Sequence, residues 1–164
     1  MLDRHLHPRI KPLLHQCVRV LDKPGITPDG LTLVGFAIGV LALPFLALGW
    51  YLAALVVILL NRLLDGLDGA LARRRGLTDA GGFLDISLDF LFYALVPFGF
   101  ILAAPQQIAL AGGWLLFAFI GTGSSFLAFA ALAAKHQIDN PGYAHKSFYY
   151  LGGLTEGTET ILLF

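Results

Sequence analysis

The sequence has few charged side chains. Its 11 Lys and Arg and 11 Asp and Glu residues make up 13% of 164 residues, whereas a soluble domain has about 25%. Hydrophobic residues make up 57%, and the mean hydropathy is +0.74. This composition excludes an ordinary soluble domain and indicates an integral membrane protein. The formal net charge is zero, so we expect no nucleic-acid partner.

Cysteine is nearly absent too. Cys17 stands alone, so the chain has no internal disulfide and no CxxC metal site. The first 25 residues are charged and lack the apolar stretch of a cleavable signal peptide. Long apolar runs follow, and at about 20 residues each they favour helices over the shorter, alternating strands of a barrel. The predicted fold class is therefore all-α, a polytopic bundle of membrane helices.

The bundle is expected to begin with an amphipathic helix. Apolar residues recur at helical spacing from Ile10 to Leu21, which predicts about three turns lying on the membrane surface. A helix packed on a soluble partner is the alternative. About five spans are then expected, at residues 27–48, 51–73, 83–103, 108–134 and from 147 onwards, with loops at 76–82 and 135–146.

The chain ends within an apolar run at residues 161–164. We expect residues 1–164 to form a single membrane domain that is C-terminally incomplete and lacks a sixth span. Two groups of small residues lie within the spans. Gly35 and Gly39 form a GxxxG motif that is expected to serve helix packing, and residues 121–125 suit close packing or a kink.

The basic residues predict the orientation. All eleven Lys and Arg side chains fall on one side of the predicted topology, and the two turns on the opposite side have none. The positive-inside rule then places the N-terminus in the cytoplasm, and a bacterial inner membrane is the favoured location.

Four carboxylates stand at that same end of the predicted spans. Asp65 and Asp68 are spaced i, i+3 and Asp85 and Asp89 are spaced i, i+4, so each pair shares one face of its helix. A short loop makes the two helices antiparallel neighbours, and the pairs can face each other. Ionised residues within membrane segments are costly and usually functional. A solvated loop is the alternative, and it fits Asp79 better than the four clustered acids.

Four ionised carboxylates at one point repel each other unless some are protonated or cations hold them together. Oxygen ligands suit Mg²⁺, Mn²⁺ or Ca²⁺, and the absence of His and Cys from the cluster argues against zinc. A two-metal site is plausible with four acids, and such a site can clamp the attacking and leaving oxygens of a phosphoryl displacement.

Small residues leave space beside these acids: Gly69, Ala72, Gly81 and Gly82. Arg73 lies one helical turn after Gly69 and can reach a phosphate bound there. Arg74 and Arg75 are better explained as anchors on the cytoplasmic side.

The pattern Asp65-x-x-Asp68-Gly69-x-x-Ala72-Arg73, followed by Gly81-x-x-x-Asp85-x-x-x-Asp89, resembles the signature of the CDP-alcohol phosphotransferases, also called CDP-alcohol phosphatidyltransferases. The interval between Arg73 and Gly81 is one residue shorter than the commonly written pattern. Asp29 stands where Asn is frequent, which leaves its role open.

The resemblance implies transfer of a phosphoryl-alcohol group from a CDP-alcohol to an acceptor hydroxyl in phospholipid synthesis, with release of CMP. It implies metal binding, by Mg²⁺ or Mn²⁺, at Asp65, Asp68, Asp85 and Asp89, with Asp89 also the catalytic base. Gly69, Ala72, Arg73 and Gly81 would line the CDP site. It further implies a homodimer. CDP-diacylglycerol with a small polar acceptor is the favoured substrate pair, and a soluble CDP-alcohol with a lipid acceptor is the alternative.

Two questions stay open at this point. Glu156 and Glu159 lie at a similar depth and either line the acceptor pocket or form hydrogen bonds with neighbouring threonines. A divalent-cation transporter or channel that uses the Asp cluster as its ion site is the alternative function. Spans one and four carry almost no polar residues on the far side, which favours the enzyme.

Overall fold

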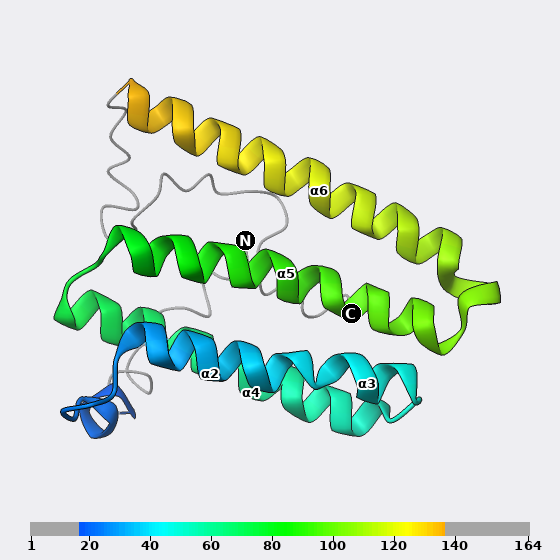
Figure 1. The fold of residues 1–164 in the computed structure, drawn as a ribbon, viewed down its shortest axis with the longest axis horizontal. Helices are drawn as coiled ribbons and strands as arrows, with labels where there is room; N and C mark the ends of the chain where they lie inside the picture. Colours follow the sequence, from blue (N-terminus) through cyan, green and yellow to red (C-terminus); the bar gives the residue numbers. More distant parts are fainter. Residues whose placement is uncertain (1–16, 137–164) are drawn as a thin grey trace, which may run out of the picture.

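A computed structural model describes residues 17–136 of the chain, and within this range it is helical (Figure 1). Residues 17–21 are helical and precede the first labelled helix. The labelled helices are α2 (Pro28–Val40), α3 (Ala42–Ala47), α4 (Tyr51–Arg75), α5 (Asp79–Ala103) and α6 (Pro105–Lys135).

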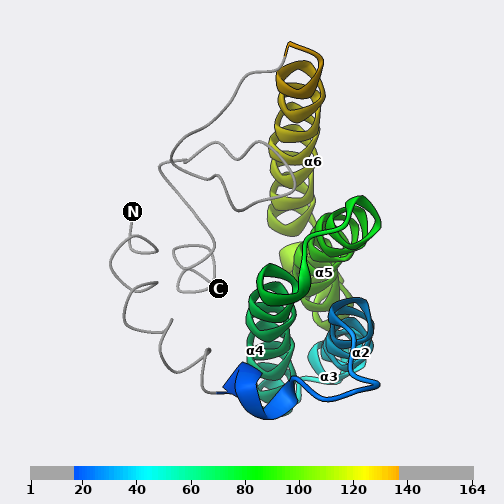
Figure 2. The ribbon, with the colours of Figure 1, turned by 90° about the vertical axis from the view of Figure 1, so that its left-hand side faces the viewer.

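The long helices run roughly parallel or antiparallel to one another. The short helices α2 and α3 follow one after the other alongside α4. α5 packs against α2 and α3, and α6 packs against α5 (Figures 1 and 2). The loop from α4 to α5 lies at one end of the bundle. The turns from α3 to α4 and from α5 to α6 lie at the other end. Two apolar clusters fill the core, one around Leu71 and one around Phe92.

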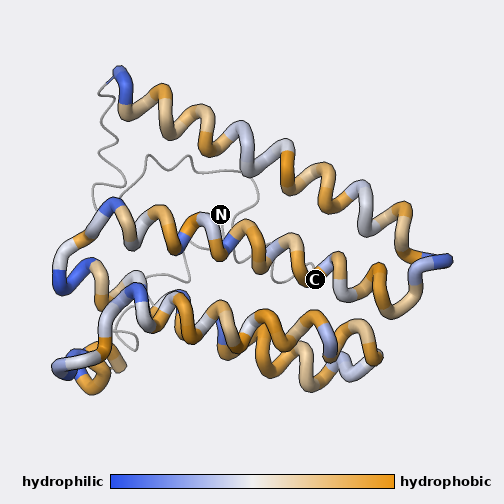
Figure 3. Tube along the Cα trace, in the orientation of Figure 1, coloured by the Kyte–Doolittle hydropathy of each residue, from blue (hydrophilic) through white to orange (hydrophobic). Residues whose placement is uncertain are grey.

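The prediction of a helical membrane bundle is confirmed. Three helical segments are long and apolar enough to cross a membrane: Pro28–Ala47, Asp79–Ala103 and Pro105–Lys135. α4 packs beside α2 and α3 and has 25 residues, and all of its charged side chains lie from Arg62 onwards. Figure 3 shows hydrophilic residues at the end of the bundle where α4 meets α5. The predicted fifth span and most of the predicted amphipathic helix lie outside the described residues.

Threonine caps start two of the helices. Thr27 Oγ1 accepts a hydrogen bond from the Gly30 amide at 3.0 Å, and Pro28 follows at the first helical position. Thr78 Oγ1 accepts from the Gly81 amide at 3.0 Å in the same way. The expected loop at residues 76–82 was therefore too long. α5 begins at Asp79 because this cap and an acidic first turn outweigh the low helix propensity of Gly81 and Gly82.

The predicted first span is confirmed as the segment Pro28–Ala47, and a one-residue turn at Leu41 divides it into α2 and α3. α2 ends at Val40 and α3 starts at Ala42, with a helical break at Leu41. Pro44 explains the break, because it has no amide hydrogen to donate and its ring clashes with the carbonyl four residues earlier, at Val40.

Small residues serve helix packing, as expected. A β-carbon on Gly35 would lie 3.1 Å from Leu64 Cβ, so this glycine lets α2 approach α4. A β-carbon on Gly123 would lie 3.0 Å from the Phe90 ring, which brings α6 close to α5. α6 continues as one helix through residues 121–125, so of the two expectations for that segment, close packing is the one observed.

The segment before α2 is tied to the end of α4. Val18 is buried against Leu67, Ala70 and Leu71. Arg74 Nε and Arg75 Nη2 form ion pairs with Asp22 at 2.8 and 2.7 Å. The two arginines therefore have a structural partner within the chain in addition to any anchoring at the membrane surface.

Candidate metal centre and substrate site

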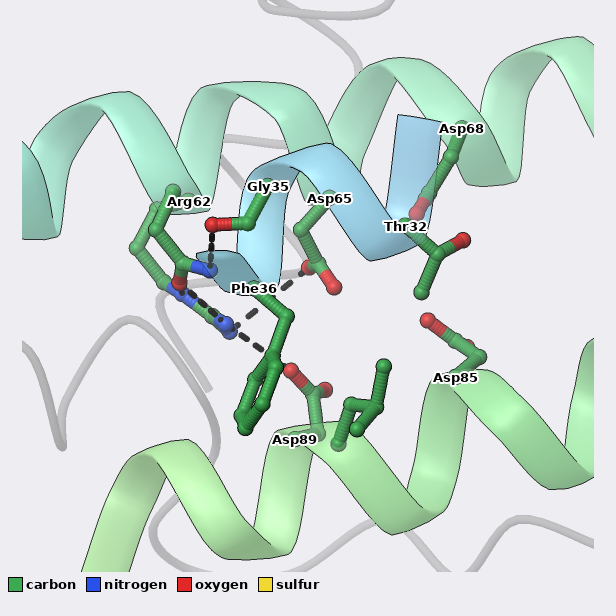
Figure 4. A pocket seen from close by; sticks show the side chains of 10 residues that line it. Thr32, Gly35, Phe36, Arg62, Asp65, Asp68, Asp85 and Asp89 are labelled. Carbon is green, nitrogen blue, oxygen red and sulfur yellow. Dashed lines mark hydrogen bonds and ion pairs between the residues drawn. The ribbon is translucent and has the colours of Figure 1, made fainter. Parts of the chain in front are cut away.

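The four predicted acids face one another across the space between α4 and α5, beside α2. Asp65 and Asp68 project from α4, and Asp85 and Asp89 project from α5 toward them (Figure 4). The acids line one small pocket together with Thr32, Gly35 and Phe36 of α2. Helical spacing places each pair on one face, and the short loop between α4 and α5 brings the faces together.

Three of the acids are close enough to share a cation. One carboxylate oxygen from each of Asp65, Asp68 and Asp85 lies within 4.8 Å of the others. Asp68 is the most enclosed at 3% exposure, and neither of its oxygens has a hydrogen-bond partner among the described residues. A buried carboxylate without such a partner is costly, and a bound cation would remove that cost.

The donor set fits a hard divalent cation. It consists of carboxylate oxygens, which Mg²⁺ and Mn²⁺ prefer, and the described part of the chain adds no His or Cys to it. Asp89 is not part of the close oxygen group. The structure thus brings together three of the four predicted metal ligands and sets the fourth beside them.

Arg62 belongs to the site, although the sequence analysis predicted for it only a place among the basic residues on the cytoplasmic side. Its Nη2 lies 2.8 Å from Asp89 Oδ1, and its Nη1 lies 3.6 Å from Asp65 Oδ2. Its side chain is only 12% exposed. A charged residue in an otherwise apolar stretch, next to Asn61, was the available signal. The sequence did not predict that its partner is Asp89, because Asp89 lies on another helix, α5.

The predicted CDP-binding residues lie in two places. A β-carbon on Gly69 would lie 3.3 Å from Arg73 Nη1, so the arginine folds back over the glycine and Ala72 lies beside them on α4. Gly81 lies in the first turn of α5, where a β-carbon would be 3.0 Å from Asp29 Oδ1. Gly81 therefore makes room for Asp29, an acid from the first turn of α2.

An apolar groove lies next to the carboxylate pocket. Its volume is about 330 Å³, and Arg62 lines both the groove and the pocket. The other lining residues come from α3, α4 and α5: Leu46, Tyr51, Ala54, Leu55, Ile58, Leu59, Phe92, Tyr93, Val96 and Phe100. Polar and apolar parts of one ligand could therefore bind on either side of Arg62.

Glu156 and Glu159, the predicted acceptor-side acids, lie outside the described residues, so their place relative to this site is not part of the structure.

Comparison with known proteins gives a family match. The family model for CDP-alcohol phosphatidyltransferase matches residues 25–151. The chain is 98% identical over 164 residues to the inner membrane protein YnjF of Escherichia coli, and this match covers all of the chain and 80% of that protein. No solved structure matches the chain.

Two more distant relatives carry enzyme names. Archaetidylinositol phosphate synthase of Pyrococcus horikoshii is 39% identical over 98 residues, which are 59% of this chain and 52% of that protein. The bifunctional IPC transferase and DIPP synthase of Rubrobacter xylanophilus is 34% identical over 96 residues, which are 58% of this chain and 22% of that protein. The matches thus span about half and about a fifth of these two enzymes. They give no support to a cation transporter.

Proposed function

We propose that this chain, which belongs to the CDP-alcohol phosphatidyltransferase family, transfers the phosphatidyl group of CDP-diacylglycerol to the hydroxyl group of a small polar alcohol. Family membership makes the chain a membrane transferase that acts with divalent metal ions. The proposal adds the substrate pair, the assignment of roles to residues and the side of the membrane. It also takes residues 1–164 as one domain.

The observation that carries the proposal is the group of three carboxylates between α4 and α5, with Asp68 buried among them and without a hydrogen-bond partner in the described part of the chain. Asp65, Asp68 and Asp85 would hold Mg²⁺ or Mn²⁺, and we assign Asp89 a share of a second metal position. Bound there, divalent cations neutralise the diphosphate of the substrate and stabilise the departing CMP.

The nucleotide is assigned to the surface around Gly69, Ala72, Arg73 and Gly81. The Arg73 guanidinium lies over Gly69, where it can donate two parallel hydrogen bonds to a phosphate. Because Gly69 has no side chain, a diphosphate can approach the surface of α4 next to the Arg73 guanidinium.

The reaction step is assigned to Asp89. Its carboxylate accepts the proton of the acceptor hydroxyl while the hydroxyl oxygen attacks the phosphorus that carries the diacylglycerol. The new O–P bond forms as the bond from that phosphorus to the CMP oxygen breaks, and CMP leaves with the electron pair. A positioned base of this kind contributes about 10²–10⁴-fold to the rate.

The apolar groove supports a lipid-linked donor. It lies between helices within the apolar part of the bundle and meets the carboxylate pocket at Arg62. An acyl chain in the groove would leave the attached phosphate near the acids. Glu156 and Glu159 remain our candidates for the acceptor side.

The site is proposed to face the cytoplasm of a bacterial inner membrane, and the protein to act as a homodimer. Arg73, Arg74 and Arg75 end α4 and Lys135 ends α6, all at the end of the bundle that holds the α4–α5 loop (Figure 1). This distribution favours the cytoplasm for that end.

The test is release of CMP by the purified chain with Mg²⁺ and a panel of CDP-alcohols and acceptors. CDP-diacylglycerol should be consumed only in the presence of metal and a hydroxyl acceptor. Asp89→Asn should lower turnover by about 10²–10⁴-fold while binding of the CDP-alcohol persists. A folded protein that releases no CMP from any pair would contradict the proposal. Full activity of Asp89→Asn would show that Asp89 is not the catalytic base.

A further inference from the structure

A group of side-chain contacts joins the segment before α2 to the last residue of α4. Arg75 Nε and Nη2 donate to Asp22 Oδ1 at 2.8 and 2.7 Å. Arg75 Nη1 also donates to the Ile26 carbonyl, and Nη2 donates to the Lys23 carbonyl at 3.1 Å. One guanidinium thus binds three groups of residues 22–26, and we call these contacts the Asp22–Arg75 clasp.

Arg74 takes a smaller part in these contacts. Its Nε lies 2.8 Å from Asp22 Oδ2, and its side chain is 51% exposed, compared with 31% for Arg75. An isolated ion pair at a surface contributes little. A guanidinium that binds one carboxylate through two nitrogens, and two carbonyls besides, has a defined orientation. The two neighbouring arginines therefore differ in their contacts despite their equal charge.

The clasp lies on the side of α4 that faces away from the proposed nucleotide residues. Positions 71 and 75 share one face of the helix. Positions 69 and 73 share the opposite face, because two residues along a helix are a rotation of about 200°. On the first face, Leu71 is buried against Val18 of the segment before α2 (Figure 2). On the other face, Arg73 folds over Gly69.

The clasp also fixes where α2 begins. Ile26, whose carbonyl Arg75 binds, directly precedes the Thr27 N-cap. In the first turn of α2, Asp29 Oδ1 would lie 3.0 Å from a β-carbon on Gly81, the proposed nucleotide residue of α5. The clasp therefore connects the end of α4 with the first turns of α2 and α5, which border the proposed nucleotide surface.

We propose that Arg75, held by Asp22, is a positioning residue for the nucleotide of the CDP-alcohol. The clasp holds the last turn of α4, so that Arg73 is already placed over Gly69 when the diphosphate arrives. Less side-chain and backbone freedom is then lost on binding. The inference rests on the proposed function, which assigns the nucleotide to this surface, and it adds two residues that contact no substrate.

The clasp makes a prediction that differs in sign from a simple effect of charge. If Asp22 acted only through its negative charge, its removal should strengthen binding of the diphosphate. Loss of Asp22 also releases Arg75, however, so the clasp predicts weaker binding. Asp22→Asn and Arg75→Gln should both weaken nucleotide binding, although they change the net charge in opposite directions.

The test measures the Kd of CDP for the purified chain in the presence of Mg²⁺, by isothermal titration calorimetry. Asp22→Asn and Arg75→Gln should each raise this Kd about fivefold. The double variant should have no larger effect than either single variant, because both remove the same contacts. With CDP-diacylglycerol as substrate, KM should rise by a similar factor while kcat changes less than about twofold.

Each variant has a matched control. Arg74→Gln removes the same charge from the neighbouring position and leaves Arg75 bound to Asp22, so the Kd of CDP should stay within about twofold. Asp79→Asn removes an exposed acid in the first turn of α5 and should not raise the Kd. Arg75→Lys keeps the charge but cannot bind the carboxylate and both carbonyls at once. It should reproduce the loss, and it replaces Arg75→Gln if that variant does not fold.

A second measurement detects the clasp without any nucleotide. Cys17 is exposed and is the one cysteine of the chain, so a nitroxide attached to it reports how firmly the segment before α2 is held. Its electron paramagnetic resonance spectrum should show faster motion in Asp22→Asn and Arg75→Gln than in the parent chain. Arg74→Gln should give the spectrum of the parent chain.

The outcomes separate the clasp from the proposed function. An unchanged Kd of CDP in both Asp22→Asn and Arg75→Gln, tighter binding in Asp22→Asn, or equal weakening by Arg74→Gln and Arg75→Gln would each overturn the positioning role. Unchanged nitroxide motion in Asp22→Asn and Arg75→Gln would overturn the clasp itself.

Two further outcomes concern the proposed function. A parent chain that binds CDP but releases no CMP would contradict the proposed reaction, and the Kd of CDP would still decide the role of the clasp. A parent chain that does not bind CDP would overturn the proposed nucleotide surface and the inference with it.

Discussion

Gly39 of α2 lies directly against Phe92 of α5. A β-carbon on Gly39 would be 2.8 Å from Phe92 Cε2 and 2.9 Å from Asn61 Nδ2. The missing side chain thus lets α2, α4 and α5 meet at one point. Because Phe92 stacks on Arg62 and Asn61 binds it, this contact also fixes the arginine that borders the carboxylate pocket.

Gly39→Ala is expected to destabilise the protein. The added methyl group must push away the Phe92 ring and the Asn61 amide, and such overpacking costs about 1–3 kcal/mol. Thermal unfolding in detergent would measure the loss. Gly113→Ala is the matched control, since a β-carbon there meets nothing within 4 Å. Equal unfolding temperatures for the two variants would contradict the close contact.

Asp68→Asn is expected to separate stability from activity. The variant removes a buried charge that has no hydrogen-bond partner among residues 17–136, so the metal-free protein should unfold at a higher temperature. CMP release should fall at least about 100-fold, because a metal ligand is lost.

The control for this variant is Asp79→Asn, which changes an exposed acid in the first turn of α5. Its CMP release should match that of the parent chain. If Asp68→Asn lowered the unfolding temperature of the metal-free protein instead, the buried carboxylate would have a stabilising partner that our assignment lacks.

Arg73→Gln is expected to weaken binding of the CDP-alcohol. The loss of hydrogen bonds from a guanidinium to a phosphate is worth about 1.5–3 kcal/mol, or roughly 10–100-fold in KM. Steady-state kinetics at saturating acceptor would measure it. Arg74→Gln, which changes the next residue along α4, should leave KM within about twofold. Similar effects of both variants would favour a general role of basic residues at the membrane surface.

Labelling of cysteines is expected to show which end of the bundle faces the cytoplasm. Cys17 is exposed, and its neighbour Val18 packs against Leu71 in the part of α4 that leads to the α4–α5 loop. In spheroplasts, a membrane-impermeant maleimide should label Cys17 only after lysis. Gln106→Cys in a Cys17→Ser background should be labelled without lysis, since residue 106 is in the first turn of α6 and the turn from α5 to α6 lies at the opposite end of the bundle (Figure 1). The reverse pattern would place the carboxylates outside the cytoplasm.

Much of the bundle could be predicted because apolar length and helix caps are local properties of the chain. Thr27 and Pro28 predicted the start of α2, and the structure agrees. The error at the start of α5 was local as well. The glycines at 81 and 82 suggested a loop, but the Thr78 cap makes them helical. The turn at Leu41 within the first span is also local, because it follows from Pro44.

The candidate site was partly predictable for a different reason. The spacing of the four acids sets their helix faces, so their convergence followed from the short α4–α5 loop. The contacts that distinguish the acids from one another come from residues distant in the sequence. Asp89 meets Arg62 across 27 positions, and Asn61 meets Gly35 across 26.

The sequence by itself determined that the chain is a bundle of membrane helices and that it carries the family signature. Hydropathy over about 20 residues and i, i+3 or i, i+4 spacing are sufficient for both. The tertiary structure decided which acids group closely and which one pairs with Arg62. That choice depends on how closely α2, α4 and α5 approach one another. Gly35 and Gly39 permit this close approach, and hydrogen bonds between the helices then hold them in place.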